Sequence, residues 1–308
     1  MALPVTETVH PDAEGLDTLP PEAILRRLLA GQERALAALA PALPDLAQGA
    51  RIMSGCLRAG GRLAYAGAGS SGLMAMADAM ELAGTFGLDP ARVLLFMAGG
   101  LPQGPALPGG PEDDAAGGAG LGGTLRAGDA AVVVAASGRT AWAVGFARAA
   151  RTAGARVIAL ANNAGTPLLA EADVPVLLAT PPEVIAGSTR MGAGTAQKAA
   201  LNLMSTLMGV HLGAIHDGRM VGLRADNAKL RARAEAIVAA IAGTGDAARA
   251  LALAAGAVKP AVLIARGLDP AEADAVLSGA DGNLRAALDG LAPEDGHKKI
   301  AIQQGGRP

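Results

Sequence analysis

The stretch RLAYAGAGSSGL, residues 62–73, decides the fold. A short apolar strand runs into a glycine-rich loop at 67–72, and the positions up to about residue 82 are typical of a helix. This order is the βα unit of a doubly wound parallel sheet. Gly67, Gly69 and Gly72 have the spacing of a dinucleotide-binding loop. Two adjacent serines, and the lack of an acid about 20 residues further on, favour a compact phosphate monoester instead.

Four more strands are predicted further along the chain. They cover residues 92–97, 129–136, 156–161 and 174–178. Residues 129–136 are apolar throughout, as in a buried parallel strand, and Pro175 indicates an edge strand. Loops rich in serine, threonine and glycine follow the strands at their carboxyl ends, where open α/β sheets bind ligands. The predicted fold class is α/β, a doubly wound, mostly parallel five-stranded sheet flanked by helices.

Helical patterns precede and follow this sheet in the sequence. Residues 1–59 hold a polar arm, expected to dock on another surface, and amphipathic helices at about 22–39 and 46–59. Residues 60–225 form the sheet domain, and residues 226–308 form a small C-terminal helical subdomain. Its helices are expected at about 226–241 with Asp226 as N-cap, 246–255, 270–278 and 283–288, before a polar tail at 292–308.

The composition of the 308 residues argues against several classes of protein. A net charge of −2 and only 2% aromatic residues give no support for a nucleic-acid surface. Cys56 is the only cysteine and the four histidines lack ligand spacing, so we expect no disulfide and no metal site. No signal peptide and no long apolar run are present, so we expect no membrane segment and a soluble, cytoplasmic protein.

A second glycine-rich stretch, residues 181–205, reads PPEVIAGSTRMGAGTAQKAALNLMS. Backbone N–H groups, the hydroxyls of Ser188 and Thr189 and the guanidinium of Arg190 precede a long apolar helix. Because a helix N-terminus attracts anions, the stretch predicts a phosphate-binding loop. Helix capping alone is the alternative, but capping does not require Arg190 in the turn.

The long segment 101–123 is expected to be irregular, because it is rich in glycine and proline. It carries an acidic cluster, Glu112-Asp113-Asp114. These carboxylates could simply keep the loop solvated. Their place after a predicted parallel strand favours an active-site role.

Many short motifs occur in a fixed order between about residues 6 and 230. They are Thr6-Glu7-Thr8, Gly60–Leu63, Gly67–Gly72, Asp78-Ala79 with Glu81, Thr85–Gly87, Ala98–Gly100, Glu112-Asp113, Ala136–Thr140, Gly187–Arg190, Ala193–Lys198, Leu201-Asn202, Ser205-Thr206, Met220-Val221 and Asn227–Leu230. In this order they resemble the N-acetylmuramic acid 6-phosphate etherases, lyases of the sugar isomerase (SIS) domain superfamily. Each piece alone is weak, but the ordered series is specific.

The resemblance implies a carbon–oxygen lyase of cell-wall amino-sugar recycling. Such enzymes cleave the D-lactyl ether at C3 of N-acetylmuramic acid 6-phosphate, giving N-acetylglucosamine 6-phosphate and D-lactate, with two glutamates and no cofactor or metal. Glu81 and Glu112 stand at the matching positions. We expect Glu81 to be the acid on the lactate oxygen and Glu112 the base at C2, or one of them to serve both halves of the reaction. Both are expected to reach the carboxyl end of the sheet.

The same resemblance assigns substrate binding to the serine and threonine loops. The candidates are Ser70, Ser71, Ser137 and Thr140, with Ser188, Thr189, Arg190 and Lys198 as further candidates. Ser137 and Thr140 could instead cap the next helix, and the partner of Lys198 stays open. A homodimer that binds a small sugar phosphate, with no nucleic-acid or membrane partner, is implied.

Two basic residues of the family pattern are missing. Leu73 stands where the family usually has arginine, and Gly192 where it usually has lysine. Two alternatives therefore stay open, a non-catalytic SIS-type sugar-phosphate-binding regulator and an aminosugar-phosphate isomerase. A regulator has less need of the two glutamates, and an isomerase needs no acid at C3.

Overall fold

The computed structural model describes residues 4–225, 228–243 and 246–291. The chain forms two compact units, divided between Ile215 and His216. The first holds the N-terminal arm, two long helices and the sheet, and the second holds the C-terminal helices. The three-part division expected from the sequence stays a prediction. The expected N-cap Asp226 and the tail 292–308 lie outside the described residues.

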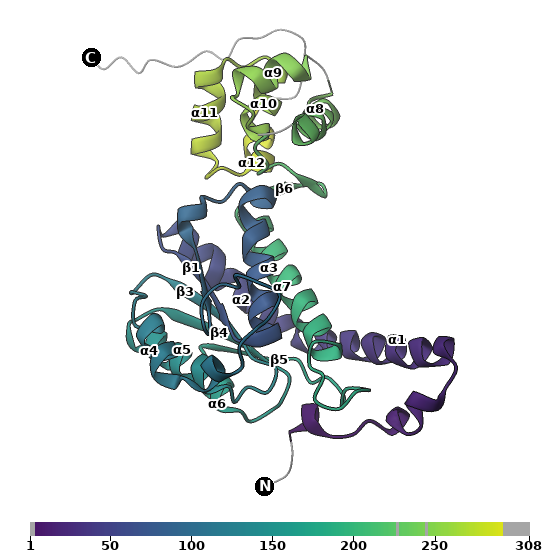
Figure 1. Ribbon diagram of the computed structural model, residues 1–308. Coiled ribbons are helices and arrows are strands. Elements are labelled where there is room, and N and C mark those ends of the chain that lie inside the picture. The colour runs from purple at the N-terminus through teal and green to yellow at the C-terminus, as the bar shows by residue number, and fades with distance from the viewer. Residues whose placement is uncertain (1–3, 226–227, 244–245, 292–308) are drawn as a thin grey trace, which may run out of the picture. The chain divides into compact units, whose positions relative to one another are not determined.

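A five-stranded parallel sheet forms the centre of the first unit (Figure 1). Its strands are β1 (Leu63–Gly67), β2 (Val93–Met97), β3 (Ala130–Val134), β4 (Arg156–Ala161) and β5 (Val174–Leu177), in the order β2-β1-β3-β4-β5. All four strand pairs are parallel, and the strand with Pro175 lies at an edge, as the sequence predicts. The strand order reverses between β1 and β3. The loops that follow these two strands therefore flank the crevice where such sheets bind ligands.

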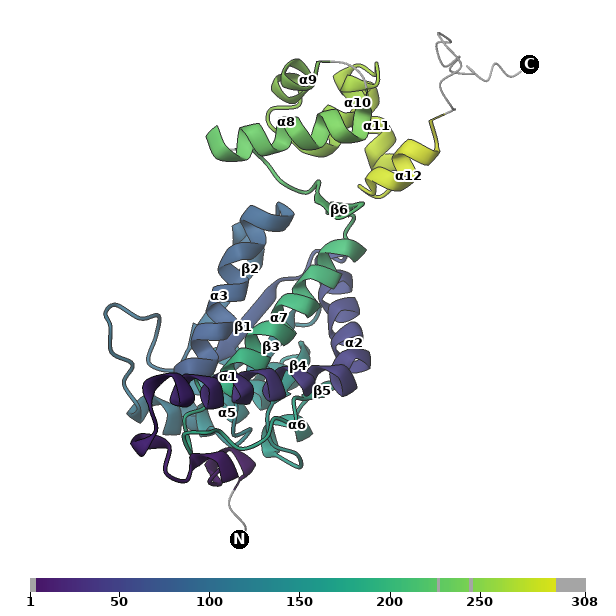
Figure 2. The same cartoon turned by 90° about the vertical axis from the view of Figure 1, so that its right-hand side faces the viewer.

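Helices cover both faces of this sheet. On one face α2 (Leu39–Arg58), α3 (Gly69–Phe86) and α7 (Gly192–His211) enclose an apolar core with alternate strand residues. On the other face α5 (Ala141–Thr152) and α6 (Pro167–Ala170) enclose a second core. Helix α1 (Pro21–Ala37) packs on α7 as an outer layer (Figure 2). The three inner strands β1, β3 and β4 are thus buried between helices, which explains their almost continuous apolar sequences.

Two helices begin earlier than the sequence indicated. Helix α2 begins at Leu39 rather than near residue 46. Pro41 lies in its first turn, where a missing N–H costs no hydrogen bond. Helix α3 begins at Gly69 rather than near residue 73, and it ends at Phe86. This earlier start places both serines of the first loop inside a helix.

The segment expected to be irregular contains a helix, so this prediction was wrong. A 3₁₀ turn, η5 (Gly110–Asp113), leads into α4 (Ala115–Gly122), which packs closely on α5. A Cβ atom on Gly118 would lie 2.1 Å from the carbonyl oxygen of Trp142, and one on Gly122 would lie 2.3 Å from that of Phe146. Only glycine permits so close an approach of two helix backbones.

Five helices form the described part of the second unit, preceded by a short strand pair that begins at Ile215, the last residue of the first unit. These are β6 (Ile215–His216), β7 (Arg219–Met220), α8 (Ala228–Ala242), α9 (Ala247–Leu253), α10 (Val258–Ala265), α11 (Pro270–Gly279) and α12 (Leu284–Asp289). Helix α10 was not predicted. Helix α11 begins where Pro270 indicated, with a capping box between Asp269 and Glu272.

The N-terminal arm docks on its own chain through three 3₁₀ turns, η1 (Val5–Glu7), η2 (Pro11–Ala13) and η3 (Leu16–Thr18). Asp12 forms an ion pair of 2.9 Å with Arg34 of α1. Arg27 donates to the backbone carbonyls of Asp12 and Glu14. The arm is therefore attached along α1.

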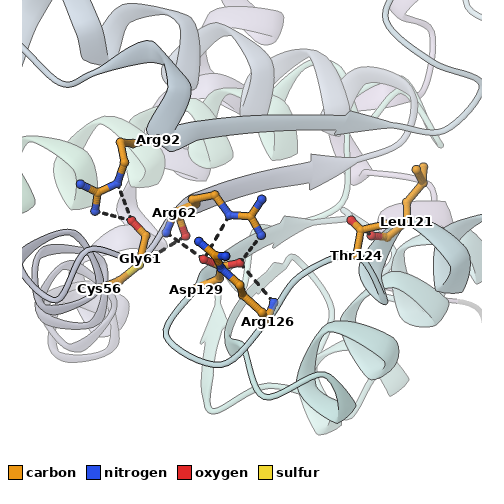
Figure 3. A network of polar contacts seen from close by, with 8 residues as sticks. All are labelled: Cys56, Gly61, Arg62, Arg92, Leu121, Thr124, Arg126 and Asp129. Carbon is orange, nitrogen blue, oxygen red and sulfur yellow. Dashed lines mark hydrogen bonds and ion pairs between the residues drawn. The ribbon is translucent and has the colours of Figure 1, made fainter.

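The buried carboxylate of Asp129 lies at the amino-terminal edge of the sheet, opposite the edge where the strands end (Figure 3). Asp129 accepts hydrogen bonds from the backbone and the guanidinium of Arg62, at 2.9 Å and 2.6 Å, and from the backbone N–H of Arg126 at 3.1 Å. Burial alone would raise the pKa of Asp129, but these hydrogen bonds and the charge of Arg62 outweigh it and lower the pKa. The ion pair thus joins the start of β1 to the start of β3.

Asp129→Asn is expected to lower the free energy of unfolding at pH 7 by about 2–3 kcal/mol, because Arg62 loses its charged partner. The wild-type carboxylate stabilises the fold fully above its unfolded pKa of 3.8. Its contribution is lost as the pH falls below that value through the lowered folded pKa. Urea unfolding from pH 7 to pH 2.5 measures both effects. Parallel pH profiles for the two proteins would contradict this account.

Candidate functional site

The loops after β1 and β3 meet at the crevice where the strand order reverses. Ser70 and Ser71 lie in the first turn of α3, whose N-cap residue Ala68 provides no side-chain cap. The hydroxyl of the buried Ser71 accepts a hydrogen bond from the backbone N–H of Ala136, at 3.3 Å. The two loops are thus joined directly. Uncapped N–H groups and hydroxyls at a helix N-terminus are suited to an anionic group.

Ser137 and Thr140 lie on the second of these loops. Thr140 is the N-cap residue of α5, but its side chain makes no capping hydrogen bond. Ser137 accepts from the backbone N–H of Arg139 at 3.1 Å, and its hydroxyl lies 3.5 Å from that of Thr140. Capping by Thr140, the alternative open from the sequence, is therefore absent. Both hydroxyls are half-buried and lie at the crevice.

Glu112 reaches the same crevice from η5. Its Oε1 atom lies 2.6 Å from the position that a Cβ on Gly69 would take, so a side chain at position 69 would displace the carboxylate. Burial, followed by the charge of Asp113, raises the pKa of Glu112 above its ordinary range. Asp114, by contrast, caps α4 by accepting from the backbone N–H of Gly117 at 2.8 Å. Of the acidic cluster, Glu112 is therefore the residue whose carboxyl group lies against the first turn of α3.

The N-terminus of α7 is not an open anion site. The buried carboxylate of Glu183 accepts from the backbone N–H groups of Gly192, at 2.9 Å, and Ala193, at 2.8 Å. A Cβ on Gly192 would lie 3.0 Å from Glu183 Oε2 and 3.1 Å from a carbon of Ala35. The chain's own carboxylate therefore occupies the position that the sequence assigned to a phosphate. The role of Glu183 was not predicted from the sequence, because this residue lies nine positions before Gly192, whose backbone N–H it binds.

Ser188, Thr189 and Arg190 form a turn just before α7. Ser188 and Thr189 are half-buried, and Arg190 is exposed. No hydrogen bond or ion pair in the described part of the chain joins them to the serine loops after β1 and β3. They stay candidates for substrate binding on a separate loop, after the edge strand β5.

Thr6 and Asn163 were also missed, and they attach the N-terminal arm to this turn. The carbonyl of Thr6 accepts from the backbone N–H of Gly187 at 3.1 Å. The hydroxyl of the buried Thr6 accepts from the side-chain amide of Asn163 at 3.2 Å. Asn163 follows β4, so the arm contributes to the wall at the carboxyl edge of the sheet. The Thr6-Glu7-Thr8 motif gave the only sequence indication of this role.

Glu81 lies far from the other candidates within one chain, so the expectation that it reaches the carboxyl end of the sheet was wrong. Helix α3 begins at that edge and runs away from it. Glu81 comes 12 residues after Gly69, about 18 Å along the helix axis. Its side chain is exposed.

Lys198 is also remote from the serine loops, on the exposed side of α7. It lies in a groove of about 750 Å³ between α1 and α7. The groove is lined by Leu36, Leu39, Thr195, Lys198, Ala199, Asn202, Leu203, Thr206, Leu207 and Val210. Leu203 and Val210 are 47% and 45% exposed, which is unusual for large apolar side chains on a long helix.

Within the described residues, no group of three or more histidine, cysteine, aspartate or glutamate side chains could hold a metal ion. In the same residues no single helix has the length and apolar character to cross a bilayer, and only the bent pair α8 and α9 meets these criteria when counted together.

Comparison with known proteins agrees with this architecture. Residues 31–162 and 118–207 match descriptions of the SIS domain. A protein named N-acetylmuramic acid 6-phosphate etherase from Deinococcus radiodurans is 45% identical over 290 residues, 92% of this chain and 94% of its own. One of the same name from Streptomyces avermitilis is 43% identical over 291 residues, 92% and 93% of the two chains.

Among solved structures, a phosphoheptose isomerase from Francisella tularensis aligns with a TM-score of 0.41 and 23% identity, covering 60% of this chain and 95% of its own. The high identity to the curated relatives, over nearly the whole of both chains, decides the family. This chain belongs to the N-acetylmuramic acid 6-phosphate etherases, which are SIS-domain proteins.

Proposed function

We propose that the protein cleaves the D-lactyl ether of N-acetylmuramic acid 6-phosphate, in cell-wall amino-sugar recycling. The observation that carries the proposal is Glu112, a half-buried carboxyl group with a raised pKa, held against the first turn of α3. A proton carrier beside the hydroxyls of Ser70 and Ser71 suits a substrate that has both a phosphate and an acidic C–H. The family to which the chain belongs supports the same reaction.

The proposed reaction is an elimination followed by a hydration. Glu112 removes the C2 proton of the ring-opened sugar, which the neighbouring aldehyde acidifies. The C3–O bond breaks, its electron pair leaves with the lactate oxygen, and Glu81 supplies the proton to that oxygen. Water then adds at C3 and a proton returns to C2, so the products are N-acetylglucosamine 6-phosphate and D-lactate. Two proton carriers suffice for these steps.

The direct test is incubation of the purified protein with N-acetylmuramic acid 6-phosphate and measurement of released D-lactate. Wild-type protein should release lactate. Glu81→Gln and Glu112→Gln should each lower turnover by a factor of about 10² or more, because each removes one proton carrier. Circular dichroism should show unchanged folding. A wild-type rate in either variant would remove that residue from the mechanism.

The two alternatives give different results in the same assay. A regulator would bind sugar phosphate and release no lactate. An isomerase would interconvert aldose and ketose phosphates without cleaving the ether. Glu81 is the feature that favours the etherase over both, since neither alternative needs a second proton carrier at C3.

We further propose that the protein acts as a cytoplasmic homodimer in which the two glutamates of one site come from different chains. Glu81 and Glu112 lie too far apart in one chain to act on the same C2–C3 bond. Glu81 shares α3 with Met80, which is 67% exposed, and the α1–α7 groove adds further exposed apolar side chains. A second copy on this surface would bury these side chains and bring Glu81 to its partner's crevice.

A mixed dimer tests this arrangement. Glu81→Gln and Glu112→Gln chains with different affinity tags are co-expressed, and the heterodimer is purified through both tags. If the site is shared between chains, one of the two sites of the heterodimer holds both glutamates. About half of the wild-type turnover should then return. Each variant homodimer serves as the inactive control. A heterodimer that forms and releases no lactate would contradict the shared site without contradicting the etherase activity of the wild type.

A further inference from the structure

A buried carboxylate that the proposed mechanism does not use lies on α3. Asp78 is 5% exposed. Its Oδ1 atom accepts from the side-chain amide of Asn202 at 2.7 Å and from the hydroxyl of Ser205 at 3.0 Å, and its Oδ2 atom accepts from the hydroxyl of Tyr65 at 3.0 Å. The carboxylate therefore joins α3 to β1 and to α7. All three partners donate, which suits the ionised form of the group.

No cation balances this charge in the described part of the chain. The groups that act on Asp78 are Tyr65 from β1, Asn202 and Ser205 from α7, and Glu81 from α3 itself. Burial raises the pKa of Asp78, the three hydrogen bonds lower it, and the charge of Glu81 raises it further. A buried carboxylate without a cation is costly to the fold, and such groups occur most often at functional sites. Of the two other buried carboxylates described above, Asp129 has Arg62 as its partner, and Glu183 accepts from backbone N–H groups at the N-terminus of α7.

Glu81 follows Asp78 by three positions on the same helix. Side chains at this spacing lie on one face, with Cβ atoms about 5–6 Å apart. The hydrogen-bonded carboxyl group of Asp78 therefore lies about one helical turn from Glu81. The hydrogen bonds of Asp78 also fix the turn of α3 that carries Glu81. A fixed position suits an acid that must reach an ether oxygen.

We propose that Asp78 is a positioning residue for the lyase reaction, which orients Glu81 by holding its turn of α3 against β1 and α7. The inference rests on the proposed function. It assigns Asp78 no contact with the substrate. Loss of the charge-assisted hydrogen bonds of Asp78 should therefore lower kcat, while KM stays close to the wild-type value.

Asp78→Asn keeps the shape of the side chain and removes its charge. Its kcat should fall by about tenfold while KM stays within about twofold of the wild-type value, because the turn of α3 that carries Glu81 is held less firmly. Asp129→Asn is the matched control, since it also removes a buried carboxylate and destabilises the fold. It should leave the kcat of the folded protein close to the wild-type value.

A gentler pair of variants serves if Asp78→Asn fails to fold. Ser205→Ala removes one donor to Asp78 and should lower kcat about threefold at unchanged KM. Ser54→Ala removes another buried serine, whose hydroxyl donates to the carbonyl of Arg51, and should leave kcat unchanged. Equal kcat values in Ser205→Ala and Ser54→Ala, or in Asp78→Asn and Asp129→Asn, would overturn the role of Asp78. Absence of lactate release by the wild type would overturn the proposed function and this inference together.

Discussion

The layers of the first unit are held in register by the carboxylate of Asp78. The core of the first unit is otherwise built from apolar contacts, which supply most of the stabilising free energy but have no preferred direction. The hydrogen bonds of Asp78 to Tyr65 and to α7 add that direction. Because α1 and α2 both pack on α7, the placement of α7 relative to β1 sets the position of the whole helical layer on this face.

A steric constraint of a different kind positions Glu112. Helix α4 can approach α5 closely only because Gly118 and Gly122 present no side chain to the α5 backbone. This contact fixes the start of α4, and Asp114 caps it. Glu112 lies two residues before that cap and is therefore held at Gly69, although it belongs to a long connection. A segment with the composition of a flexible loop thus holds the carboxyl group of Glu112 in one position.

The sheet could be predicted from the sequence because each buried parallel strand is a continuous apolar run, and Pro175 identified an edge strand. Helix α4 could not, because its glycines have poor helix propensity and are used for packing against α5. The capping of α7 by Glu183 could not be predicted from the sequence either. Its bonds to Gly192 and Ala193 depend on the path of the turn between them. The same cap explains why a small residue fits at position 192.

The candidate site could likewise be predicted only in part from the sequence. Ser71 and Ser137 could be placed together because topology alone brings the ends of β1 and β3 side by side. Glu81 could not be placed, since its distance from the crevice depends on where α3 begins. Because α3 begins at Gly69, a single chain holds Glu112 at the crevice and Glu81 on an exposed surface with Met80. In the homodimer that we propose, burial of this surface favours association and also brings Glu81 to the partner's crevice. A substitution on the surface would therefore affect both association and catalysis.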